Sequence, residues 1–600
     1  MRFVSHICNM TYIEKLAAIR SQMRADGVDA YLIPSADPHM SEYLPNYYKC
    51  ISFATGFKGS VSTVIITADF AGLWADSRYF EQAAQQLKGS GFELVKLKAQ
   101  HAPEYIGWLA KTLPQGATVA FDENMVSVAL GDSMQQQLAD KKISFQHKDY
   151  LQSIWPERPA LPEKPAFLIE DQFAGASAPE KLDAIRAEMR EKGCTHHLVS
   201  SLDDMAWIFN LRGQDVNYNP VVLSFALITE TGATIYVQQD KLKAADKELL
   251  QSKGIALADY NAIKHDLAQL PANSSLLIDP RRNCLALYKL VPSTVRIVKD
   301  MNPSTFLKAI KNKTEIEHTR IAMRKDGVAM TRFFKWMKDN IGKTRITELS
   351  ASAVLRDFRA QQEGFAGESF GTIAGYKDHG ALPHYAPSPE SDVEITPDGL
   401  FLVDSGGQYY YGTTDITRML PLGNPTEEER IDYTLVLKGM IEGCRVRFPK
   451  GTCGYQIDAI TRRPLWEHAL NYGHGTGHGV GYFLNVHEGP QIFNPTPTAI
   501  PVELGMITSV EPGIYRPGKH GVRIENLVLT VADESNAFNE FYAFETLTLA
   551  PIDTSIVKKD LLEPAQIDWL NTYHQRVYDT LSPHLTADEQ VFLKEMTAAI

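Results

Sequence analysis

A weak internal repeat is the feature that most constrains the fold of this chain. Residues 15–38 (KLAAIRSQMRADGVDAYLIPSADP) align with residues 181–204 (KLDAIRAEMREKGCTHHLVSSLDD) at an offset of 166, with 11 of 24 positions identical. In each copy, apolar residues at helical spacing lead to a glycine, Gly27 or Gly193, which is a common helix C-cap. An apolar strand, a serine and an aspartate follow in register. The alternative is chance likeness between two amphipathic helices, but the shared register favours two similar α/β domains.

The remaining sequence changes character at recognisable points. Residues 151–170 hold four prolines and are expected to link the two domains. A second boundary near 300–315 leads into a long helical pattern, and the chain from about 395 to 550 is strand-rich with glycine and proline turns. The last 40 or so residues return to a helical pattern. We therefore expect an α/β fold with three domains: an α/β domain at 1–160, a related one at 161–312, and an α+β domain at 313–600 with a helical extension at about 551–600.

Composition excludes several classes of protein. The 600 residues are 44% apolar and 22% charged, with a formal net charge of -12, so a basic surface for nucleic acid is absent. No run of 18 apolar residues occurs, and the first residues lack the apolar core of a signal peptide. The six cysteines are scattered without CxxC spacing, which fits a reducing compartment; Cys453 is expected to be a core residue. We expect a cytoplasmic protein without nucleic-acid or membrane partners.

Two segments of the strand-rich region place acidic residues inside apolar strand patterns. In FLVDSGGQYYYGTTDITRML, Asp404 ends an apolar strand and Asp415 is expected within a Thr-rich strand. In ITSVEPGIYRPGKHGVRIENLVL, Glu511 ends an apolar strand and Glu525 is expected within the next one. An unpaired buried carboxylate is costly, and several carboxylates close together raise one another's pKa. A multivalent cation resolves both problems, so these four residues are candidate metal ligands.

A glycine-rich sequence with two histidines, YGHGTGHGVGYFLNVHEGP, lies between these segments. His474 and His478 are four residues apart, which on a helix would place them on one face. The surrounding glycines disfavour a helix, so we expect a tight turn and strand in which the two histidines have different roles. Carboxylates and imidazole without thiolates favour Mn, Co, Fe or Zn over a thiolate zinc site.

Each of these motifs has a simpler interpretation when it is taken alone. An aspartate before Ser-Gly is usually a turn residue, and a glutamate in Ile-Glu-Asn is usually a paired strand carboxylate. HGTGH alone is also compatible with a phosphate-binding glycine loop. The ordered set Asp, Asp, His, Glu, Glu disfavours these interpretations together and favours a metal site.

The order and local context of these residues (VDSG, TTDITR, HGTGHGVG, SVEPG, RIEN) resemble those of the pita-bread metallopeptidases. That family includes aminopeptidase P, prolidase, methionine aminopeptidase and creatinase. The resemblance is strong over about 315–550. HGTGHGVGYFLNVHEGP is similar to the Xaa-Pro aminopeptidases, in particular the long three-domain cytosolic type, in which two related domains precede the catalytic domain. The repeat at offset 166 agrees with that arrangement.

The resemblance implies a role for each candidate ligand. Asp404 is expected to chelate one metal ion, Asp415 and Glu525 to bridge both ions, and His478 and Glu511 to complete the second. The implied cofactors are two divalent ions, with Mn²⁺ as the expected metal and Zn²⁺ or Co²⁺ as alternatives. The implied assembly is a homodimer.

Three further histidines match the substrate-handling set of the family: His384 in LPHYAP, His474 in the glycine loop and His487 in NVHEG. We expect His384 or His487 to stabilise the oxyanion that develops on the substrate carbonyl. The loop that leads to His384, GYKDHGALPHY, is less typical of the family at His379 and Pro383.

The implied function is that of a metalloaminopeptidase that releases the first residue of Xaa-Pro-Yaa peptides by attack of a metal-bridging hydroxide. Two metal ions roughly 3.5–4 Å apart lower the pKa of a shared water, and Glu511 is the candidate general base and then acid. Because the prolyl nitrogen carries no N–H, recognition must use an apolar pocket shaped for the ring. Phe370 and Tyr385 are candidates for its wall, although a core role is more common for such aromatics.

Two alternatives stay open at this point. A prolidase would share all the ligands but cleave only Xaa-Pro dipeptides. Prolidases are shorter than this chain and lack the second N-terminal domain. A non-catalytic binding module on the same fold would not need the metals, and the intact ligand set argues against it.

Overall fold

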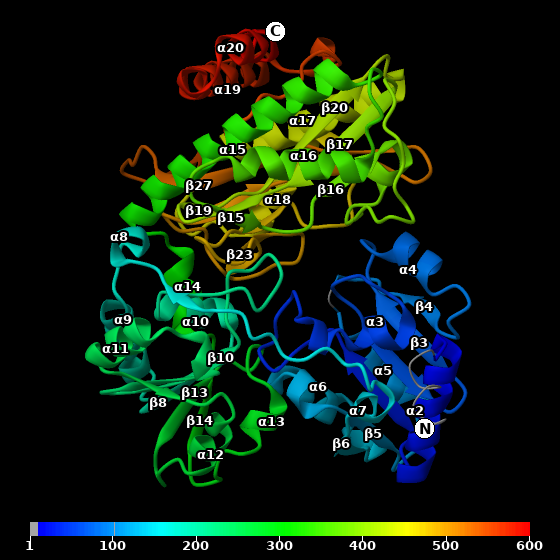
Figure 1. Cartoon of the computed structure of the whole chain (residues 1–600), viewed down its shortest axis with the longest axis vertical. Helices are drawn as coiled ribbons and strands as arrows, with labels where there is room; N and C mark the ends of the chain where they lie inside the picture. Colours follow the sequence, from blue (N-terminus) through cyan, green and yellow to red (C-terminus); the bar gives the residue numbers. More distant parts are fainter. Residues whose placement is uncertain (1–9, 101) are drawn as a thin grey trace. The chain divides into compact units, whose positions relative to one another are not determined.

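The computed structural model describes residues 10–100 and 102–600, which form two compact units (Figure 1). The first unit contains the chain up to residue 170 together with 176–304, and the second contains 171–175 together with 305–600. Residues 171–175 thus belong to the second unit although the chain on both sides of them belongs to the first. Cys8 lies outside the described residues. Within the described ranges no helix has the length and apolarity needed to cross a membrane.

The first helix of each repeat copy ends within two residues of the glycine that the sequence predicts as its end. Helices α2 (Tyr12–Asp26) and α9 (Ala178–Glu191) both start with a capping box, in which side chains satisfy the free amides of the first turn. The chain then passes through a left-handed glycine, Gly27 at φ 65° and Gly193 at φ 63°. Glycine adopts this conformation without steric cost, so it ends both helices and turns the chain into a strand.

The two copies form six-stranded sheets of one topology. The first sheet has the order β4-β3-β2-β1-β5-β6 and the second the order β12-β11-β10-β8-β13-β14, with matching parallel and antiparallel pairs. The two copies of the repeat therefore share a sheet topology as well as a sequence pattern. The strands of the first sheet, in chain order, are Ala30–Pro34, Thr63–Thr67, Ala71–Ala75, Glu93–Lys96, Thr118–Phe121 and Ser144–His147. Those of the second are His196–Val199, Ser224–Thr229, Ala233–Val237, Ile255–Ala258, Ser275–Ile278 and Arg296–Lys299.

These two sheets are joined at equivalent places of the repeat. Ser127 follows β5 and Cys284 follows β13, and the two residues form an antiparallel bridge. The amide of Val128 donates to the carbonyl of Asn283 at 3.0 Å, and that of Leu285 donates to the carbonyl of Val126 at 2.8 Å. The two copies are thus joined directly by backbone hydrogen bonds, and they act as one unit.

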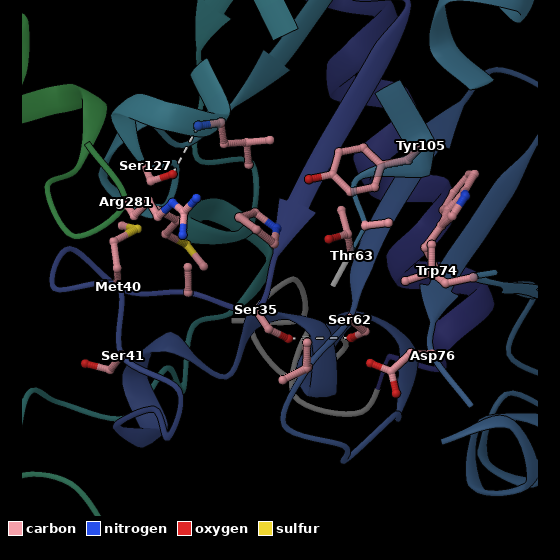
Figure 2. A pocket seen from close by; sticks show the side chains of 17 residues that line it. Ser35, Met40, Ser41, Ser62, Thr63, Trp74, Asp76, Tyr105, Ser127 and Arg281 are labelled. Atoms are coloured by element: carbon pink, nitrogen blue, oxygen red, sulfur yellow. Dashed lines mark hydrogen bonds between the residues drawn. The ribbon is translucent and has the colours of Figure 1, made fainter. Parts of the chain in front are cut away.

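A cavity of about 240 Å³ lies beside the ends of β1 and β3 (Figure 2). Its acidic group, Asp76, forms two hydrogen bonds with the guanidinium of Arg78, at 2.7 and 2.8 Å. Ser127, on its wall, caps helix α6 (Val128–Gln137) by accepting from the amide of Leu130 at 3.2 Å. These polar side chains are therefore engaged in turns and caps.

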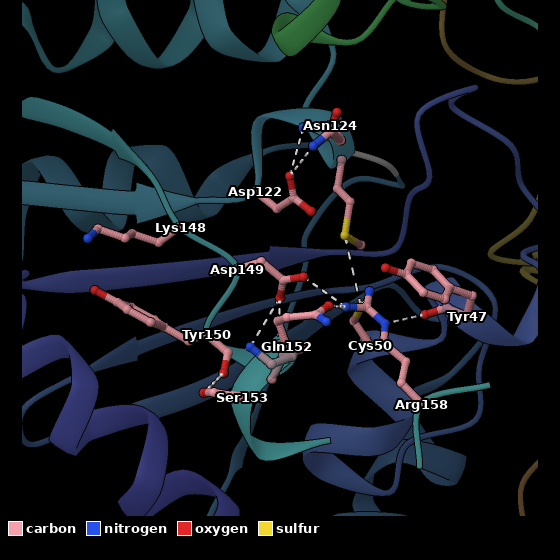
Figure 3. Close-up of polar contacts among 12 residues, drawn as sticks. Tyr47, Cys50, Asp122, Asn124, Lys148, Asp149, Tyr150, Gln152, Ser153 and Arg158 are labelled. Carbon is pink, nitrogen blue, oxygen red and sulfur yellow. Dashed lines mark hydrogen bonds and ion pairs between the residues drawn. The ribbon is translucent and has the colours of Figure 1, made fainter. Parts of the chain in front are cut away.

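Arg158 fixes the beginning of the proline-rich linker to the first domain (Figure 3). Its Nη1 donates to Asp149 at 2.8 Å, its Nε donates to the carbonyl of Tyr47 at 3.0 Å, and its guanidinium lies 3.9 Å from the centre of the Tyr47 ring. The linker expected at 151–170 is thus bound to the first domain near its start. Its first residues form a short helix, α7 (Leu151–Ile154).

The second unit is built on antiparallel sheets. One sheet has the order β16-β17-β20, a second the order β15-β18-β19, and a third the order β21-β28-β27-β24-β22-β23, with the hairpin β25-β26 beside them. The strands from β15 onward are Phe365–Glu368, Ile373–Tyr376, Gly399–Ser405, Gly407–Tyr409, Gly412–Thr413, Ile416–Leu422, Phe448–Pro449, Gly477–Gly479, Glu488–Phe493, Ile507–Val510, Gly513–Arg516, His520–Arg523, Asn526–Ala532 and Phe541–Thr546.

Strand β17 shows how the helices cover both faces of its sheet. Leu400 and Leu402 pack into the core formed with α17 (Glu427–Arg445), α18 (Gly454–Trp466) and α19 (Pro564–Leu581). Phe401 and Val403, on the opposite face, pack against α15 (Lys313–Asn340) and α16 (Glu348–Ala360). Each such buried side chain contributes about 1.5–3 kcal/mol. The helical tail, α19 and α20 (Ala587–Met596), therefore belongs to the core of this unit.

Three local expectations were wrong. Asp415 lies between β19 and β20, and Glu525 lies between β26 and β27, rather than within strands. The amide of Glu525 donates to the carbonyl of Thr417 at 3.2 Å, in a different sheet, so the strand is interrupted where the carboxylate turns toward its neighbours. Cys453 is half-exposed at the start of α18 rather than part of the core.

Candidate metal centre

The candidate ligands come from strand ends of two different sheets. Asp404 lies near the end of β17 opposite Thr417, and Asp415 directly precedes β20 of the same sheet. His478 lies in β22 and Glu511 directly follows β24, which are neighbouring strands of the large sheet. Glu525 directly precedes β27, the next strand of that sheet. Residues that are far apart in the sequence are thus brought to one place.

Short distances join these side chains. Ligand atoms of Asp415, His478 and Glu525 lie within 4.8 Å of one another. Nε2 of His478 lies 3.4 Å from Oδ2 of Asp415 and 3.4 Å from Oε1 of Glu511. The carboxylate of Asp404 accepts from Arg523 at 2.7 Å and adds its charge to that of Asp415 and Glu525. All five predicted ligands therefore lie together, with Asp404, Asp415 and Glu525 buried and His478 and Glu511 half-buried.

The electrostatics of the site disfavour four free carboxylates. Burial raises the pKa of Asp404 to about 6 and that of Glu511 to about 7, and the repulsion of Asp415 adds to both. Burial and the charges of Asp415, Glu511 and Asp404 raise the pKa of Glu525 well above its usual range. Burial lowers the pKa of His478, but Asp415 and Glu511 outweigh this and raise it to about 9. Excess negative charge is thus the main property of this pocket.

The donor set fits divalent cations. Oδ1 of Asp404 is buried and has no hydrogen-bond partner among the described residues, so one ligand atom of the pocket is unsatisfied. Carboxylate oxygens with a single imidazole suit hard to borderline ions such as Mn²⁺, Co²⁺ or Zn²⁺. Bound cations would neutralise the repulsion that raises the carboxylate pKa values.

Hydrogen bonds orient the imidazole and one carboxylate. Nδ1 of His478 lies 2.9 Å from the carbonyl of Gly479, so the Nδ1–H donates there and Nε2 faces Asp415 and Glu511. The hydroxyl of Ser509 accepts from the amide of His478 at 3.0 Å and donates to Glu511 at 3.1 Å. The side chains are thus fixed before any ion binds.

Helix α18 holds the glycine loop. Asp458 accepts from the amide and the hydroxyl of Thr476 at 3.2 and 2.7 Å. Arg462 donates to the carbonyls of Tyr472 and His474 at 2.7 and 2.5 Å. A Cβ on Gly477 would lie 1.8 Å from the carbonyl oxygen of Ser509, so only glycine fits at this close approach.

The structure separates His474 from His478, as the sequence predicts. Nε2 of His474 lies 2.8 Å from the hydroxyl of Tyr515, and Nδ1 lies 2.7 Å from the carbonyl of Gly475. The ring of His487 lies edge to face against that of His478, with 4.3 Å between centroids. His487 is thus beside the ligands, whereas His474 is connected to them through Tyr515.

Arg523 is the main site residue that the sequence reasoning missed. It is 2% exposed and donates from Nε and Nη2 to Asp404, at 3.2 and 2.7 Å, and from Nη1 to Tyr515 at 2.7 Å. Because Tyr515 accepts this bond, its hydroxyl donates to His474, which gives a chain of bonds from Asp404 to His474. The signal in the sequence was a lone arginine two residues before Glu525 inside an apolar strand.

The loop of His384 is tied to the same arginine. Nη2 of Arg523 donates to the carbonyl of Pro383 at 3.2 Å, so the residue before His384 is anchored at the site. Buried Glu348 organises the rest of this loop by accepting from the hydroxyl of Tyr385 at 2.8 Å and from His379 at 2.9 Å. The hydrogen bond between His379 and Glu348 raises the pKa of His379.

The two aromatic candidates for the proline pocket are both buried. Phe370 and Tyr385 are each 8% exposed, and Tyr385 is engaged through its hydroxyl with Glu348. The structure thus gives Tyr385 a clear part in the fold of the His384 loop.

A second buried arginine ties the helical tail to the ligands. Arg418 donates to the carbonyls of Thr417, in β20, and of Glu525, just before β27, at 3.0 and 2.5 Å. It also donates to the hydroxyl of Tyr573 in α19 at 2.9 Å and to the carbonyl of Ala550 at 3.1 Å. The C-terminal helices thus support the backbone next to Glu525.

Comparisons with known proteins show the family of this chain. Residues 317–532 match the model of metallopeptidase family M24. Residues 15–148 and 157–315 match models of the creatinase/prolidase N-terminal domain, and 540–600 match the C-terminal region of the M24 peptidases. A probable Xaa-Pro aminopeptidase P of Sordaria macrospora is 36% identical over 596 residues, which cover 96% of this chain and 97% of that protein. The chain belongs to metallopeptidase family M24.

Solved structures extend this assignment to the whole chain. An X-prolyl aminopeptidase from Caenorhabditis elegans, described as a cytosolic enzyme with a di-nuclear active site, matches with a TM-score of 0.94 and 32% identity. The match covers 99% of this chain and all of that one. An Xaa-Pro dipeptidase from Bacillus anthracis, at 23% identity and a TM-score of 0.51, shares the fold over 63% of this chain. The fold is therefore two related N-terminal α/β domains followed by an M24 pita-bread domain.

Proposed function

We propose that this chain is a dinuclear metalloaminopeptidase that releases the N-terminal residue from peptides with proline in the second position. The observation that carries the proposal is the cluster of Asp415, Glu511 and Glu525 around His478, with the charge of Asp404 beside it. The substrate class is supported by full-length similarity to proteins named Xaa-Pro aminopeptidase, whereas the dipeptidase match covers a smaller part of the chain.

We assign the ligands as the sequence predicts. Asp404 would hold one ion through its unsatisfied Oδ1, while Arg523 binds its Oδ2. Asp415 and Glu525 would contribute to both ions, and His478 and Glu511 would complete the second. The central place of Asp415 supports its bridging role, because its charge raises the pKa values of Asp404, Glu511 and Glu525.

The protein groups around the ions supply proton transfer and charge stabilisation. When bound, two divalent ions polarise the scissile carbonyl and lower the pKa of a shared water. Glu511 is placed to accept a proton and return it to the leaving prolyl nitrogen, because its carboxylate lies at the site, 3.4 Å from Nε2 of His478. Ser509 fixes the orientation of this carboxylate through a bond of 3.1 Å.

Three histidines are assigned to the substrate. His487, edge to face with His478, and His384, whose loop is anchored by Arg523, are placed to stabilise negative charge on the carbonyl oxygen. His474 is assigned a catalytic role through its chain of hydrogen bonds to Asp404. Phe370 remains our candidate for the apolar wall that recognises the proline ring.

A tripeptide assay separates this function from that of a prolidase. Release of Xaa from Xaa-Pro-Yaa supports an aminopeptidase. Cleavage of Xaa-Pro dipeptides without any release of Xaa from the tripeptide would show a prolidase instead.

Metal analysis tests the proposal against a non-catalytic role for the fold. We expect two equivalents of divalent metal per chain and activity that is lost on stripping and restored on adding metal back. A protein without stoichiometric metal, and inactive after each candidate ion is added, would be a binding module.

We further propose Mn²⁺ as the physiological ion, with Zn²⁺ and Co²⁺ as alternatives, and a cytoplasmic homodimer as the working form. Activity after reconstitution with each ion and the mass of the protein in sedimentation test these points. We also propose domain limits of 1–160, 161–312 and 313–600, which limited proteolysis tests.

A further inference from the structure

The loop formed by residues 480–488 determines where His487 lies. It begins just after β22, which carries His478, and ends at the first residue of β23, next to His487. A hydrogen bond from the amide of Gly481 to the carbonyl of Asn485, at 3.0 Å, closes a turn within it. Because His487 contacts the ring of His478, a small displacement of this loop changes the arrangement of the site.

Tyr482 anchors the start of the 480–488 loop. Its side chain is 2% exposed, and its hydroxyl lies 2.7 Å from the carbonyl of Phe173 and 2.9 Å from Nδ1 of His318. The carbonyl can only accept, so the hydroxyl donates to Phe173 and accepts from the Nδ1–H of His318. The ring of Phe173 packs against that of His318 with 5.7 Å between centroids.

Phe173 belongs to a short segment with an unusual place in the chain. It lies in α8 (Asp171–Ala174), within the five residues that join the second unit while the flanking chain belongs to the first. The carbonyl of Ala174 accepts from Asn312 at 2.9 Å, at the N-cap of α15. Segment 171–175 is therefore bound to both the 480–488 loop and helix α15.

A buried ion pair anchors the end of the same loop. Nζ of Lys311 lies 2.5 Å from Oε1 of Glu488, and both side chains are 1% exposed. Lys311 also donates to the carbonyl of Lys308 at 2.8 Å, and its amide donates to the carbonyl of Gly505 at 3.0 Å. Lys311 lies in 305–312, where the chain enters the second unit for the last time.

The middle of the loop is held by the catalytic sheets themselves. The carbonyl of Leu484 accepts from Gln408 at 2.7 Å and from Thr413 at 3.2 Å. Thr413 lies two residues before Asp415. The loop is thus tied to the site at its centre and to the two connecting segments, 171–175 and 305–312, at its ends.

We propose that Tyr482 and the Lys311–Glu488 pair are positioning residues for His487, through which the two connecting segments fix the geometry of the substrate site. This inference rests on the proposed function, because it takes His487 as a residue that contacts the substrate. The anchors bind the loop rather than the metal ligands, so their loss changes turnover and leaves metal content intact.

Replacing Tyr482 by phenylalanine tests the first anchor, because Tyr482→Phe keeps the ring and removes the hydroxyl. We expect kcat on an Xaa-Pro-Yaa peptide to fall by about 10–100-fold while KM changes by less than about 3-fold. Metal stoichiometry should equal that of the wild type. The matched control is Tyr433→Phe, since Tyr433 is a buried tyrosine of α17 that donates to the carbonyl of Asp553; this variant should keep the wild-type kcat.

The second anchor is tested by a double substitution. Lys311→Met together with Glu488→Gln removes both charges, so that no buried charge is left unpaired. We expect the same pattern of lowered kcat, similar KM and unchanged metal content. Wild-type kcat in this variant and in Tyr482→Phe would overturn the proposal.

Hydrogen exchange followed by mass spectrometry gives a readout that does not depend on activity. In the metal-loaded protein, both variants should exchange faster than the wild type over 480–488, and Tyr433→Phe should not. If the wild type releases no residue from Xaa-Pro-Yaa, the proposed function fails, and the exchange result still decides whether the anchors hold the loop. If exchange over 480–488 is unchanged in the variants, the positioning role is wrong. It is also wrong if exchange is faster in the variants but kcat equals that of an active wild-type enzyme.

Discussion

Nη2 of Arg523 donates to Oδ2 of Asp404 at 2.7 Å, inside a pocket that also holds three other carboxylates. Arg523 opposes the effect of burial on Asp404 and keeps its pKa lower than it would otherwise be. It leaves Oδ1 of Asp404 unsatisfied, so one oxygen is occupied by the protein and the other is available to an ion. A side chain outside the predicted ligand set thus orients one of the predicted ligands.

Replacing Arg523 by methionine should weaken metal binding. Without the guanidinium the pKa of Asp404 rises further, so protons compete better with metal. We expect the affinity at neutral pH to fall by about 10–100-fold, as for other residues that support a ligand, and the deficit to shrink as pH rises. Calorimetric titration with metal measures this. Arg516→Met is the control, because Arg516 lies on the same hairpin but pairs with Asp432; equal affinities in the two variants would contradict the prediction.

Metal binding to the stripped protein should release protons. The pKa values of Asp404, at about 6, and Glu511, at about 7, and the strongly raised pKa of Glu525 mean that the empty site carries protons near neutral pH. Ions bind the deprotonated carboxylates, so the apparent affinity rises with pH until these groups are ionised. Heats measured in two buffers with different ionisation enthalpies give the number of protons released. A buffer-independent heat at pH 6–7 would show that the site is already ionised.

Asp415→Asn should abolish turnover in metal-replete buffer. Asparagine keeps the size of the side chain but lacks the charge that a bridging ligand shares between two ions. The fall in kcat should exceed about 100-fold, the upper range for residues that only support a ligand. Asp398→Asn, at an exposed aspartate that pairs with Lys377, is the control and should stay active. A wild-type rate for Asp415→Asn would remove Asp415 from the ligand set.

The strands and glycine loop could be predicted because their signals are local. Apolar runs that end at Asp404 and Glu511 mark strand ends, and the glycines around His474 and His478 exclude a helix. The repeat likewise predicted two similar α/β folds, since a helical pattern, a glycine and an apolar strand recur in the same order.

The partners of the site could not be predicted, because they depend on contacts between distant segments. Nothing next to Arg523 in the sequence indicates Asp404, which lies in another sheet. The expectation that Asp415 and Glu525 lie within strands was wrong for a related reason. At Glu525 the backbone amide bonds with Thr417 of another sheet instead of with a neighbouring strand of its own sheet. The apolar periodicity of one segment does not show which distant segment its backbone bonds with.

His384→Ala should lower turnover while metal content is kept. The structure ties the backbone before His384 to Arg523 and gives the metal ligands other partners, so loss of the imidazole removes charge stabilisation rather than an ion. We expect kcat to fall by about 100-fold, as when one oxyanion donor is removed. Assays with metal analysis on the same sample test this. Loss of metal in the variant would show that His384 is a ligand.

Tyr573→Phe should lower stability more than activity. The hydroxyl of Tyr573 accepts from Arg418 at 2.9 Å and donates to the carbonyl of Ala550 or Thr548, so its loss leaves buried polar groups unsatisfied. We expect a cost of about 1–3 kcal/mol, measured from the urea midpoint of the metal-free protein, because bound metal adds its own stabilisation. Arg418 keeps its bonds to Thr417 and Glu525, so kcat of the metal-loaded enzyme should change little. Tyr578→Phe, in the same helix, is the control. A fall in kcat without a shift of the midpoint would mean that α19 acts on the site directly rather than by supporting the fold around Arg418.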